Sequence, residues 1–396
     1  TRAVLARELS LEQIKFISRH ASIETEIFVH GALCFCHSGQ CYMSSLIGRR
    51  SGNRGMCAQP CRMQYSLGGR MDDFPMSLKD NCLIDRLKEI EDAGVKCVKI
   101  EGRMKRPEYT AIVTKIYSKA IKEQRQPTPE EMRSLELVEL LRESIERQFE
   151  GFELVYQPQI AADTRRVVGA EALARWKCAK YGPVSPGEFI PLLEQSGLII
   201  PFGRWVFREA AAQCKAWTKL CPDLKISVNL SYLQVTTDNM VPFISDTLKR
   251  LGLSPANVMV EFTESCMIRE NTRIRAVFES IRSLGIRIAM DDFGTGYSSL
   301  GMLKTSPADV VKIDRTFVRD ILTSQFDATF IHFVVALCHD VNIKVCLEGV
   351  EREEEFDRVR SMGLDFIQGF LFEKPVPPDA FEQGFLMGGA SGCRGR

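Results

Sequence analysis

Two neighbouring stretches, VMVEFTES at residues 258–265 and IRIAMDDFG at residues 286–294, decide the fold of this chain. In each stretch an apolar run ends on carboxylates, first Glu261 and then Asp291 with Asp292. Short apolar runs rich in β-branched residues are typical of buried strands. The thirty positions from Glu261 to Asp291 leave room for a helix and two turns, so the pair predicts a βαβ unit of a parallel sheet.

The same pattern recurs in six further runs. They are FELVYQP (152–158), VVGAEALARW (167–176), KISVNLS (225–231), DVVKIDR (309–315), IKVCLEGVE (343–351) and DFIQGF (365–370). Each run delivers an amide, a carboxylate or a lysine, in chain order Gln157, Glu171, Asn229, Lys312 with Asp314, Glu348 with Glu351, and Gln368. Eight strands separated by helical segments predict an α/β fold of the (β/α)8 barrel type, in which the carboxyl ends of the strands meet at one mouth.

The polar residues at these strand ends are therefore expected to converge on one point. Carboxylates and an amide oxygen are hard donors suited to Mg²⁺ or Mn²⁺. Each motif alone has an ordinary interpretation, as a solvated loop, an Asx turn or a surface lysine. Their joint occurrence changes this, because several inward charges are costly unless they are paired or coordinated. We interpret the mouth as a metal-dependent phosphoryl-transfer or hydrolysis site.

Length and composition set the outer limits. The chain has 396 residues, so two domains are expected at roughly 100–200 residues each. A formal net charge of +1 argues against binding a nucleic acid duplex through overall charge. No apolar run approaches the roughly 18 residues of a membrane span, and the first ten residues lack the apolar core of a secretory signal. Fourteen cysteines without such a signal predict a cytoplasmic protein in a reducing compartment.

Four segments are expected along the chain. Residues 1–125 form a cysteine-rich piece, and residues 126–146 form a linker and a leading helix at the prolines of QRQPTPEEM. Residues 147–387 form the barrel, close to the roughly 250 residues that one such barrel needs. Residues 388–396 form a Gly-rich, disordered tail.

The barrel motifs together resemble those of the EAL domains, a family of cyclic di-GMP phosphodiesterases. The motifs are YQP, EALARW, VNLS, EFTES, DDFGTGYSSL, KIDRTFV, EGVE and QGFLFEKPVP, and the family tripeptide stands at residues 171–173. The resemblance implies a TIM-like barrel with one reversed strand. It also implies hydrolysis of cyclic di-GMP to linear pGpG with Mg²⁺ or Mn²⁺, and a homodimer formed through this domain. Leu347 stands where alanine is usual and keeps the position apolar.

Carried over residue by residue, the resemblance gives each polar position a role. It implies that two cations, bridged by Asp291, are held by Glu171, Asn229, Glu261, Asp291, Asp292 and Glu348. It further implies catalytic roles at or around the attacking water for Lys312, Glu348 and Gln368, and contacts to water or substrate from Gln157, Arg175, Asp314 and Glu351. Glu264 would anchor the loop DDFGTGYSSL (291–300), whose glycines at 294 and 296 permit unusual backbone shapes.

A second set of chemically active residues lies near the start of the chain. The stretch HGALCFCHSGQCYMSSLIGRRSGNRGMCAQPCRMQY contains Cys34, Cys41, Cys57 and Cys61 in a C-x6-C-x15-C-x3-C spacing. Four soft thiolates so close together are typical ligands of an iron–sulfur cluster or of zinc. The alternative is a scatter of ordinary free cysteines, since the whole region is rich in them.

This stretch and SLKDNCLIDRLKEIEDAGVKCVKIEGRMKRPEY resemble the collagenase-like peptidase family, which includes RNA-hydroxylation and quinone-hydroxylation proteins with a [4Fe–4S] cluster. The resemblance covers residues 1–120. It implies that the first three cysteines of the spacing ligate the cluster, with Cys61 or Cys82 as the fourth ligand. The first half of that family's barrel and its usual continuation are missing, so we expect an incomplete α/β fragment without activity of its own.

Three functions follow from these patterns. A metal-dependent phosphodiesterase acting on cyclic di-GMP is favoured. A receptor that binds the nucleotide without cleaving it is the second, and the intact ligand set argues against it. An iron–sulfur RNA-modification or peptidase-family protein, acting through the first fragment, is the third, and its missing half argues against it.

Overall fold

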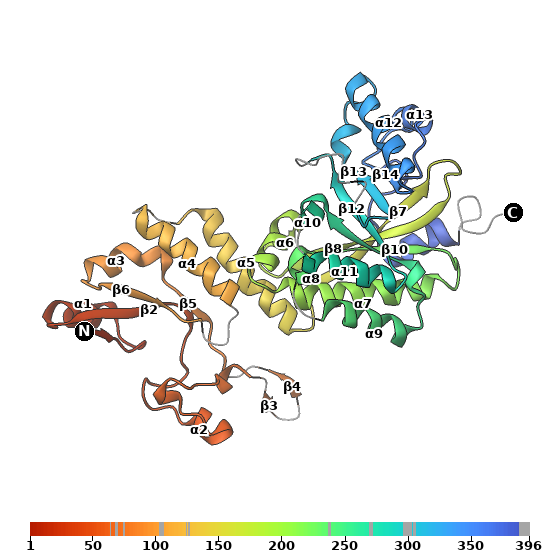
Figure 1. Cartoon of the computed structure of the whole chain (residues 1–396). Coiled ribbons are helices and arrows are strands. Elements are labelled where there is room, and N and C mark those ends of the chain that lie inside the picture. Colours follow the sequence, from red (N-terminus) through yellow and green to blue (C-terminus); the bar gives the residue numbers. More distant parts are fainter. Residues whose placement is uncertain are drawn as a thin grey trace. The chain divides into compact units, whose positions relative to one another are not determined.

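The computed structural model describes residues 1–63, 65–67, 70–73, 76–102, 107–123, 125, 127–236, 239–268, 272–295, 303 and 306–387. The chain folds as two compact units (Figure 1). The first comprises Thr1–Glu139 and Gln195–Gly197, and the second comprises Leu140–Glu194 and Leu198–Arg396. Among the described residues, no helix combines the length and the apolar character needed to cross a membrane. The segment 388–396, expected to be a disordered tail, lies outside the described residues.

The second unit is built around a closed barrel of eight strands. Their order is β10 (Lys225–Asn229), β11 (Val258–Thr263), β12 (Arg287–Phe293), β13 (Val310–Ile313), β14 (Lys344–Glu348), β15 (Phe366–Gln368), β7 (Phe152–Ala161) and β8 (Val167–Cys178). The barrel closes because β8 pairs with β10. A short strand, β9 (Gly182–Val184), pairs with the far end of β8. The predicted TIM-like α/β barrel is confirmed.

One strand runs against the others. β7 is antiparallel to both of its neighbours, β15 and β8, whereas the remaining pairings within the barrel are parallel. This confirms the reversed strand that the family resemblance implied. The reversal places Gln157 directly opposite Glu171 in the β7–β8 ladder. Gln157 therefore enters the site from the middle of its strand and not from a carboxyl end.

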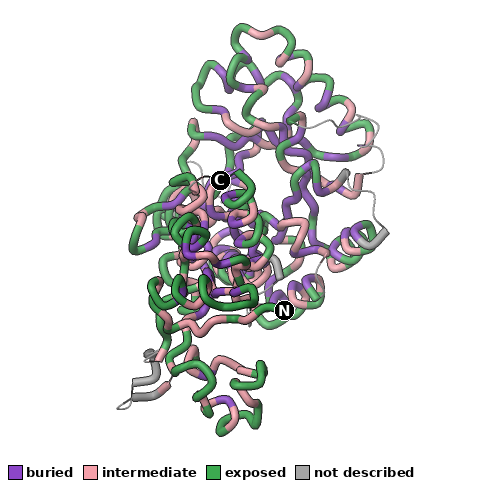
Figure 2. The backbone as a smooth tube through the Cα atoms, turned by 90° about the vertical axis from the view of Figure 1, so that its left-hand side faces the viewer, coloured by how far each residue is buried: buried purple, intermediate pink, exposed green. Residues whose placement is uncertain are grey.

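Helices connect the strands and cover the outside of the barrel. They are α6 (Pro186–Gln195), α7 (Ile199–Trp217), α8 (Tyr232–Thr236), α9 (Met240–Leu251), α10 (Glu264–Ile268), α11 (Thr272–Ser283), α12 (Gln325–Asp340), α13 (Glu353–Arg360) and α14 (Pro378–Phe381). In α12 the buried residues Ile331, Val334, Val335 and Cys338 follow the spacing of one helix face. Figure 2 shows buried residues running along the strands and exposed residues on the outer turns of the helices. The core of this unit thus lies between the barrel wall and its helices.

The first unit is a smaller α/β structure. Its central strand, β2 (Glu24–Ala32), pairs in parallel with β1 (Arg2–Val4) and β6 (Cys97–Ile100) and antiparallel with β5 (Asp80–Cys82). Its helices are α1 (Leu11–His20), α2 (Met43–Gly48), α3 (Leu87–Asp92), α4 (Pro107–Lys122) and the first part of α5 (Pro129–Glu146). Two further strands, β3 (Tyr65–Leu67) and β4 (Arg70–Asp73), form a separate antiparallel pair. Its fully buried side chains include Val29, Ile84, Val113, Tyr117 and Leu137. This small core is the α/β fragment that the sequence predicts.

Candidate metal centre and active site

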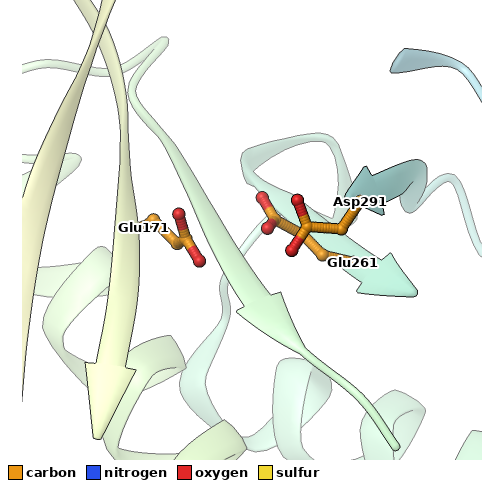
Figure 3. A group of neighbouring side chains, drawn as sticks. All are labelled: Glu171, Glu261 and Asp291. Carbon is orange, nitrogen blue, oxygen red and sulfur yellow. The ribbon is translucent and has the colours of Figure 1, made fainter. Parts of the chain in front are cut away.

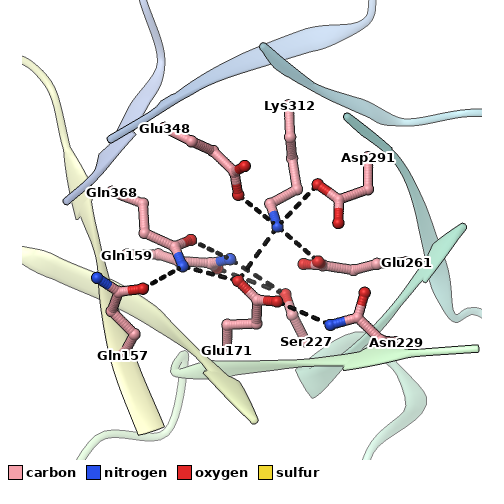
Figure 4. A network of polar contacts seen from close by, with 10 residues as sticks. All are labelled: Gln157, Gln159, Glu171, Ser227, Asn229, Glu261, Asp291, Lys312, Glu348 and Gln368. Carbon is pink, nitrogen blue, oxygen red and sulfur yellow. Dashed lines mark hydrogen bonds and ion pairs between the residues drawn. The ribbon is translucent and has the colours of Figure 1, made fainter. Parts of the chain in front are cut away.

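Seven parallel strands and the reversed one bring their polar side chains together at one end of the barrel (Figure 4). Asn229, Glu348 and Gln368 are the last residues of their strands. Glu171 differs, because β8 continues to Cys178 beyond it. Glu261, Asp291 and Asp292 also lie inside their strands, but within two residues of the strand end. The mouth therefore lies near the strand ends, with Glu171 the ligand candidate farthest from the end of its strand.

Lys312 is the centre of this arrangement. Its Nζ lies 2.6 Å from Glu261 Oε2 and 2.7 Å from Glu348 Oε1. It lies 3.2 Å from Glu171 Oε2 and also 3.2 Å from Asp291 Oδ1. The lysine side chain is only 1% exposed. Burial alone would lower the pKa of Lys312, but the four carboxylates raise it well above its ordinary value, so the ammonium stays charged.

The carboxylates differ in their protonation. Burial, reinforced by the charge of Glu171, raises the pKa of Glu261 well above its ordinary value despite the opposing effect of Lys312. Burial acts in the same direction on the pKa of Glu171. There it is outweighed by the Lys312 ammonium and by hydrogen bonds from Gln368 and Asn229, so the pKa of Glu171 is lowered. Of the two facing acids, Glu171 is therefore the better ionised ligand.

Two further acids complete the cluster. Burial raises the pKa of Glu348 to about 8, with Lys312 opposing and Asp291 adding to the shift. Burial and the neighbouring Asp291 raise the pKa of Asp292 to about 6. A divalent cation would reverse these shifts, because it favours the ionised form of a carboxylate bound to it.

A bulge in β12 allows two consecutive aspartates to serve one site. Successive side chains of a regular strand point to opposite faces. The register between β12 and β13 shifts between Met290 and Phe293, and Asp292 adopts a left-handed φ of 56°. Left-handed backbone is uncommon for a residue other than glycine and is often found at functional sites. The distortion turns Asp292 toward the same centre as Asp291.

The donor set fits a pair of divalent cations. Oxygens of Glu171, Glu261 and Asp291 lie within 4.8 Å of one another, and so do oxygens of Asp291, Asp292 and Glu348. Figure 3 shows the first group, with three carboxylates from three strands. Glu261 Oε1 is buried and, among the described residues, has no hydrogen-bond partner. A buried oxygen left in this state is costly, and a hard cation would satisfy it.

A hydrogen bond joins the first residue of α10, which follows β11, to the residue after β12. Glu264 Oε2 accepts a 2.9 Å hydrogen bond from the backbone nitrogen of Gly294, as expected for a loop anchor. Gly294 has a φ of 97°, and a Cβ there would lie 2.5 Å from the ring of Phe317. Glycine is therefore required at 294 for its conformation and for space. The expected second glycine, Gly296, lies outside the described residues.

Of the residues expected to contact the substrate, some belong to the hydrogen-bond network of the site and others do not. Gln157 belongs to the network, since its Oε1 accepts a 3.0 Å hydrogen bond from Gln368 Nε2 and its own Nε2 donates to the carbonyl of Glu373 at 3.2 Å. Arg175 is half-buried on β8 and donates to the carbonyl of Ala174 at 2.9 Å. Burial lowers the pKa of the Arg175 guanidinium.

Asp314 and Glu351 lie after their strands and not among the network residues of Figure 4. The Asp314 carboxylate accepts a 2.9 Å hydrogen bond from the backbone nitrogen of Thr316 and so caps the turn Arg315–Phe317. Glu351 is exposed. Their roles toward water or substrate stay predictions.

Sequence reasoning missed two members of the network. Gln159 on β7 and Ser227 on β10 are 6% and 0% exposed, and Gln159 bonds to Ser227 and to Gln368. The signal was present, because each is a polar residue at an inward position of a strand whose neighbours are buried.

In the first unit Cys34, Cys41 and Cys57 lie close enough to Cys61 to affect its thiol, but among the described residues no three of these sulfurs lie within 4.8 Å of one another. Burial raises the pKa of the Cys61 thiol, and Cys34, Cys57 and Cys41 are close enough to raise it further. Cys57 Sγ accepts a 3.2 Å hydrogen bond from the backbone nitrogen of Gln59. Cys82, the other candidate for a fourth ligand, interacts with Tyr117.

Comparison with known proteins matches this chain to two protein families and to several relatives. The family model described as EAL domain matches residues 139–375, and the model of Peptidase family U32 matches residues 1–162. The bifunctional diguanylate cyclase/cyclic di-GMP phosphodiesterase MucR of Pseudomonas aeruginosa is 38% identical over 246 residues, which is 62% of this chain and 36% of that protein. The signaling protein YkoW of Bacillus subtilis is 39% identical over 244 residues, 62% of this chain and 30% of that protein. The chain thus spans about a third of the length of these relatives.

Solved structures of two such proteins are also similar to this chain. The phosphodiesterase of P. aeruginosa MucR, in complex with cyclic di-GMP, is 38% identical with a TM-score of 0.59 and covers 62% of this chain and 100% of its own. The cGMP-bound EAL enzyme Bd1971 is 31% identical with a TM-score of 0.63 and covers 69% of this chain and 75% of its own.

Proposed function

This chain belongs to the EAL domain family, and from this we propose that it is a metal-dependent phosphodiesterase that hydrolyses cyclic di-GMP to linear pGpG. The observation that carries the proposal is Asp291, which belongs to both groups of three carboxylates. Two cations that share a ligand in this way can stabilise the attacking and the leaving oxygen of an in-line displacement.

The charge of the mouth supports the need for cations. Five acids converge on a single buried ammonium: Glu171, Glu261, Asp291, Asp292 and Glu348. A phosphodiester anion would meet net negative charge there and would be repelled. Mg²⁺ or Mn²⁺ held by these acids and by Asn229 would offset that charge and lower the pKa of water.

The chain's own residues would supply the remaining steps. Lys312 is held in place by four carboxylates, and we assign it the stabilisation of negative charge that develops at phosphorus. Glu348, whose Oε1 lies 2.7 Å from Lys312 Nζ, is the proposed acceptor of the proton that the attacking water loses. Gln368 is tied to Glu171 at 2.7 Å and would hold that ligand and the water in line. Arg175 would receive a substrate phosphate.

The test is direct. Purified chain is incubated with cyclic di-GMP and Mg²⁺ or Mn²⁺, and the products are resolved by chromatography. The proposal expects pGpG, and addition of a chelator should stop its appearance. Binding of the nucleotide without product in either metal would show that the chain is the receptor that the sequence left as the alternative.

We propose in addition that the enzyme acts as a homodimer formed through its barrel and in the cytoplasm. Twelve of the fourteen cysteines are free among the described residues, which supports a reducing compartment. The oligomeric state is measured by sedimentation with and without cyclic di-GMP, and a monomer under both conditions would refute the dimer.

For the first unit we propose a [4Fe–4S] cluster and no independent activity. The support is the spacing of Cys34, Cys41, Cys57 and Cys61 in the sequence and the electrostatic effect of the first three on the Cys61 thiol. Thiolates are the ordinary ligands of such clusters.

A further inference from the structure

The layer of side chains beneath the carboxylates is apolar on one side of the barrel and polar on the other. Because side chains repeat with period two along a strand, the residue two positions from each network residue also points inward. On one side these residues are apolar and pack together: Met259, Ala289, Val310 and Cys346, with Phe366 against them. On the other side the corresponding positions hold Gln159, Gly169 and Ser227.

Gln159 is therefore a buried amide beside an apolar layer, where unpaired polar groups are costly. Its nitrogen lies 3.3 Å from Ser227 Oγ and 3.3 Å from Gln368 Oε1. Its oxygen lies 3.5 Å from the same Ser227 hydroxyl. Both N–H groups of Gln159 thus have acceptors, and one of these acceptors belongs to the residue that touches Glu171 (Figure 4).

The amide of Gln368 works only in one orientation. Its Nε2 donates to Glu171 Oε2 at 2.7 Å and to Gln157 Oε1 at 3.0 Å. Turning the amide over would set its oxygen against the Glu171 carboxylate, acceptor to acceptor. It would also set its nitrogen against the nitrogen of Gln159, donor to donor. Gln159 therefore adds to Glu171 and Gln157 in favouring the orientation in which Gln368 donates to Glu171.

Space for this amide is provided by a glycine. Gln159 and Gly169 are directly opposite in the β7–β8 ladder. A Cβ at Gly169 would lie 2.8 Å from Gln159 Oε1 and 3.0 Å from the carbonyl oxygen of Lys225. The first contact is shorter than real side chains make and the second is tight, so a side chain at 169 would displace the flexible Gln159 amide.

We propose that Gln159, held by Ser227, is a positioning residue that fixes the Gln368 amide and through it the orientation of Glu171, the proposed ligand of the first cation. The inference rests on the proposed metal site. It assigns no contact between Gln159 and the cation or the nucleotide.

The test compares Mn²⁺ affinities, measured from the electron paramagnetic resonance signal of free Mn²⁺, in the full chain and its variants. Gln159→Leu keeps the approximate volume and removes the donor. It should bind Mn²⁺ about 10–100-fold more weakly, the usual effect of removing a partner of a metal ligand. Met259→Leu lies in the same layer without hydrogen bonds and serves as the matched control, with affinity unchanged.

A double variant tests whether Gln159 affects Mn²⁺ binding through Gln368. If Gln159 acts through Gln368, then Gln159→Leu added to Gln368→Leu should weaken Mn²⁺ binding no further than Gln368→Leu alone. Full additivity would overturn the proposal, and so would wild-type affinity in Gln159→Leu. Should Gln159→Leu fail to fold, Ser227→Ala replaces it, with an expected loss of about 2–10-fold for one hydrogen bond, and an unchanged affinity would again overturn the proposal.

The readout does not use the nucleotide. If the wild-type chain binds Mn²⁺ and does not cleave cyclic di-GMP, the proposed function fails while the affinities still decide this inference. If the wild-type chain binds no Mn²⁺, both are overturned.

Discussion

Lys312 and Glu261 form an ion pair that is shut off from solvent. Nζ lies 2.6 Å from Oε2, and the two side chains are 1% and 0% exposed. Their strands, β13 and β11, are separated by β12, so the pair spans the interior of the barrel. Burying a charge without its partner is strongly unfavourable. The contact between these two residues therefore contributes to the stability of the barrel, and both residues also belong to the proposed active site.

Replacing Lys312 by methionine should destabilise the protein in the absence of divalent cations. Four carboxylates would lose their shared ammonium, and breaking a buried pair costs about 3–5 kcal/mol. Urea unfolding in the presence of a chelator measures the loss. Mg²⁺ should restore more stability to Lys312→Met than to the wild type, because the cation replaces the missing charge.

The same variant tests the catalytic role. Loss of one charged donor to the transition state should lower kcat by about 10²–10³-fold. Affinity for cyclic di-GMP, measured by calorimetry in Ca²⁺, should change little. An unchanged kcat would remove Lys312 from the reaction, and a parallel loss of affinity would make it a phosphate-binding residue.

Glu171→Ala should abolish turnover, because it removes the acid whose pKa is lowered and which belongs to the first carboxylate group. Glu279→Ala, an exposed acid on α11, is the control and should keep wild-type activity. Ca²⁺ should inhibit the wild type, since it prefers 6–8 ligands and longer bonds than a compact two-cation site offers. Near wild-type turnover by Glu171→Ala at saturating Mg²⁺ would show that the ligand assignment is wrong.

A shortened chain of residues 127–387 should fold and hydrolyse cyclic di-GMP by itself. It keeps α5 whole, including the buried Leu141 and the half-buried Ser144. Ser144 Oγ accepts a 3.2 Å hydrogen bond from Trp176 Nε1. Circular dichroism and the product assay measure the outcome. A chain that is unfolded when the full-length protein is folded would mean that the first unit is required for the barrel.

Glu355 should contribute stability that depends on pH. Burial would raise its pKa, but hydrogen bonds from the backbone nitrogen of Glu351 and from the side chain and backbone nitrogen of Arg352 outweigh this and lower the pKa below its ordinary value. A lowered acid pKa stabilises the fold above the unfolded value, and this contribution is lost as pH falls through the folded value. Glu355→Gln should therefore cost about 1 kcal/mol at neutral pH.

The check is urea unfolding of both proteins from pH 7 downward. The difference between wild type and Glu355→Gln should shrink once the pH falls below about 4.3, the ordinary pKa of a glutamate. A difference that stays constant over this range would assign the effect to shape and not to charge.

Reconstitution of the full chain with iron and sulfide under anaerobic conditions should give the broad visible absorption of an iron–sulfur cluster. Cys57→Ser should remove it, because Cys57 is one of the three cysteines around Cys61. Cys97→Ser is the control, since its thiol faces the carbonyl of Val98 at 3.7 Å in β6. Equal iron content in both variants would refute the cluster assignment.

The local sequence pattern was sufficient to predict most strands of the barrel. The apolar runs became strands because buried strands require such residues wherever they pair. Polar residues after these runs converge because parallel strands share one carboxyl end. The type of site followed from the same pattern, since carboxylates and an amide at one mouth suit hard divalent cations. The reversed direction of β7 was not visible in its composition and came from family resemblance alone.

The sequence by itself determined which apolar runs form the barrel strands and that carboxylates and amides gather near the ends of those strands. Only the tertiary structure decided that Lys312 touches four carboxylates, that a bulge turns Asp292 beside Asp291, and that Asp314 caps a turn. It also decided that Gln159, on the reversed strand, supports Gln368 at the far end of the chain. The physical reason is register. A strand's composition fixes which face is buried, but which residues meet across a closed barrel depends on how all eight strands are staggered, and that is set only when the barrel closes.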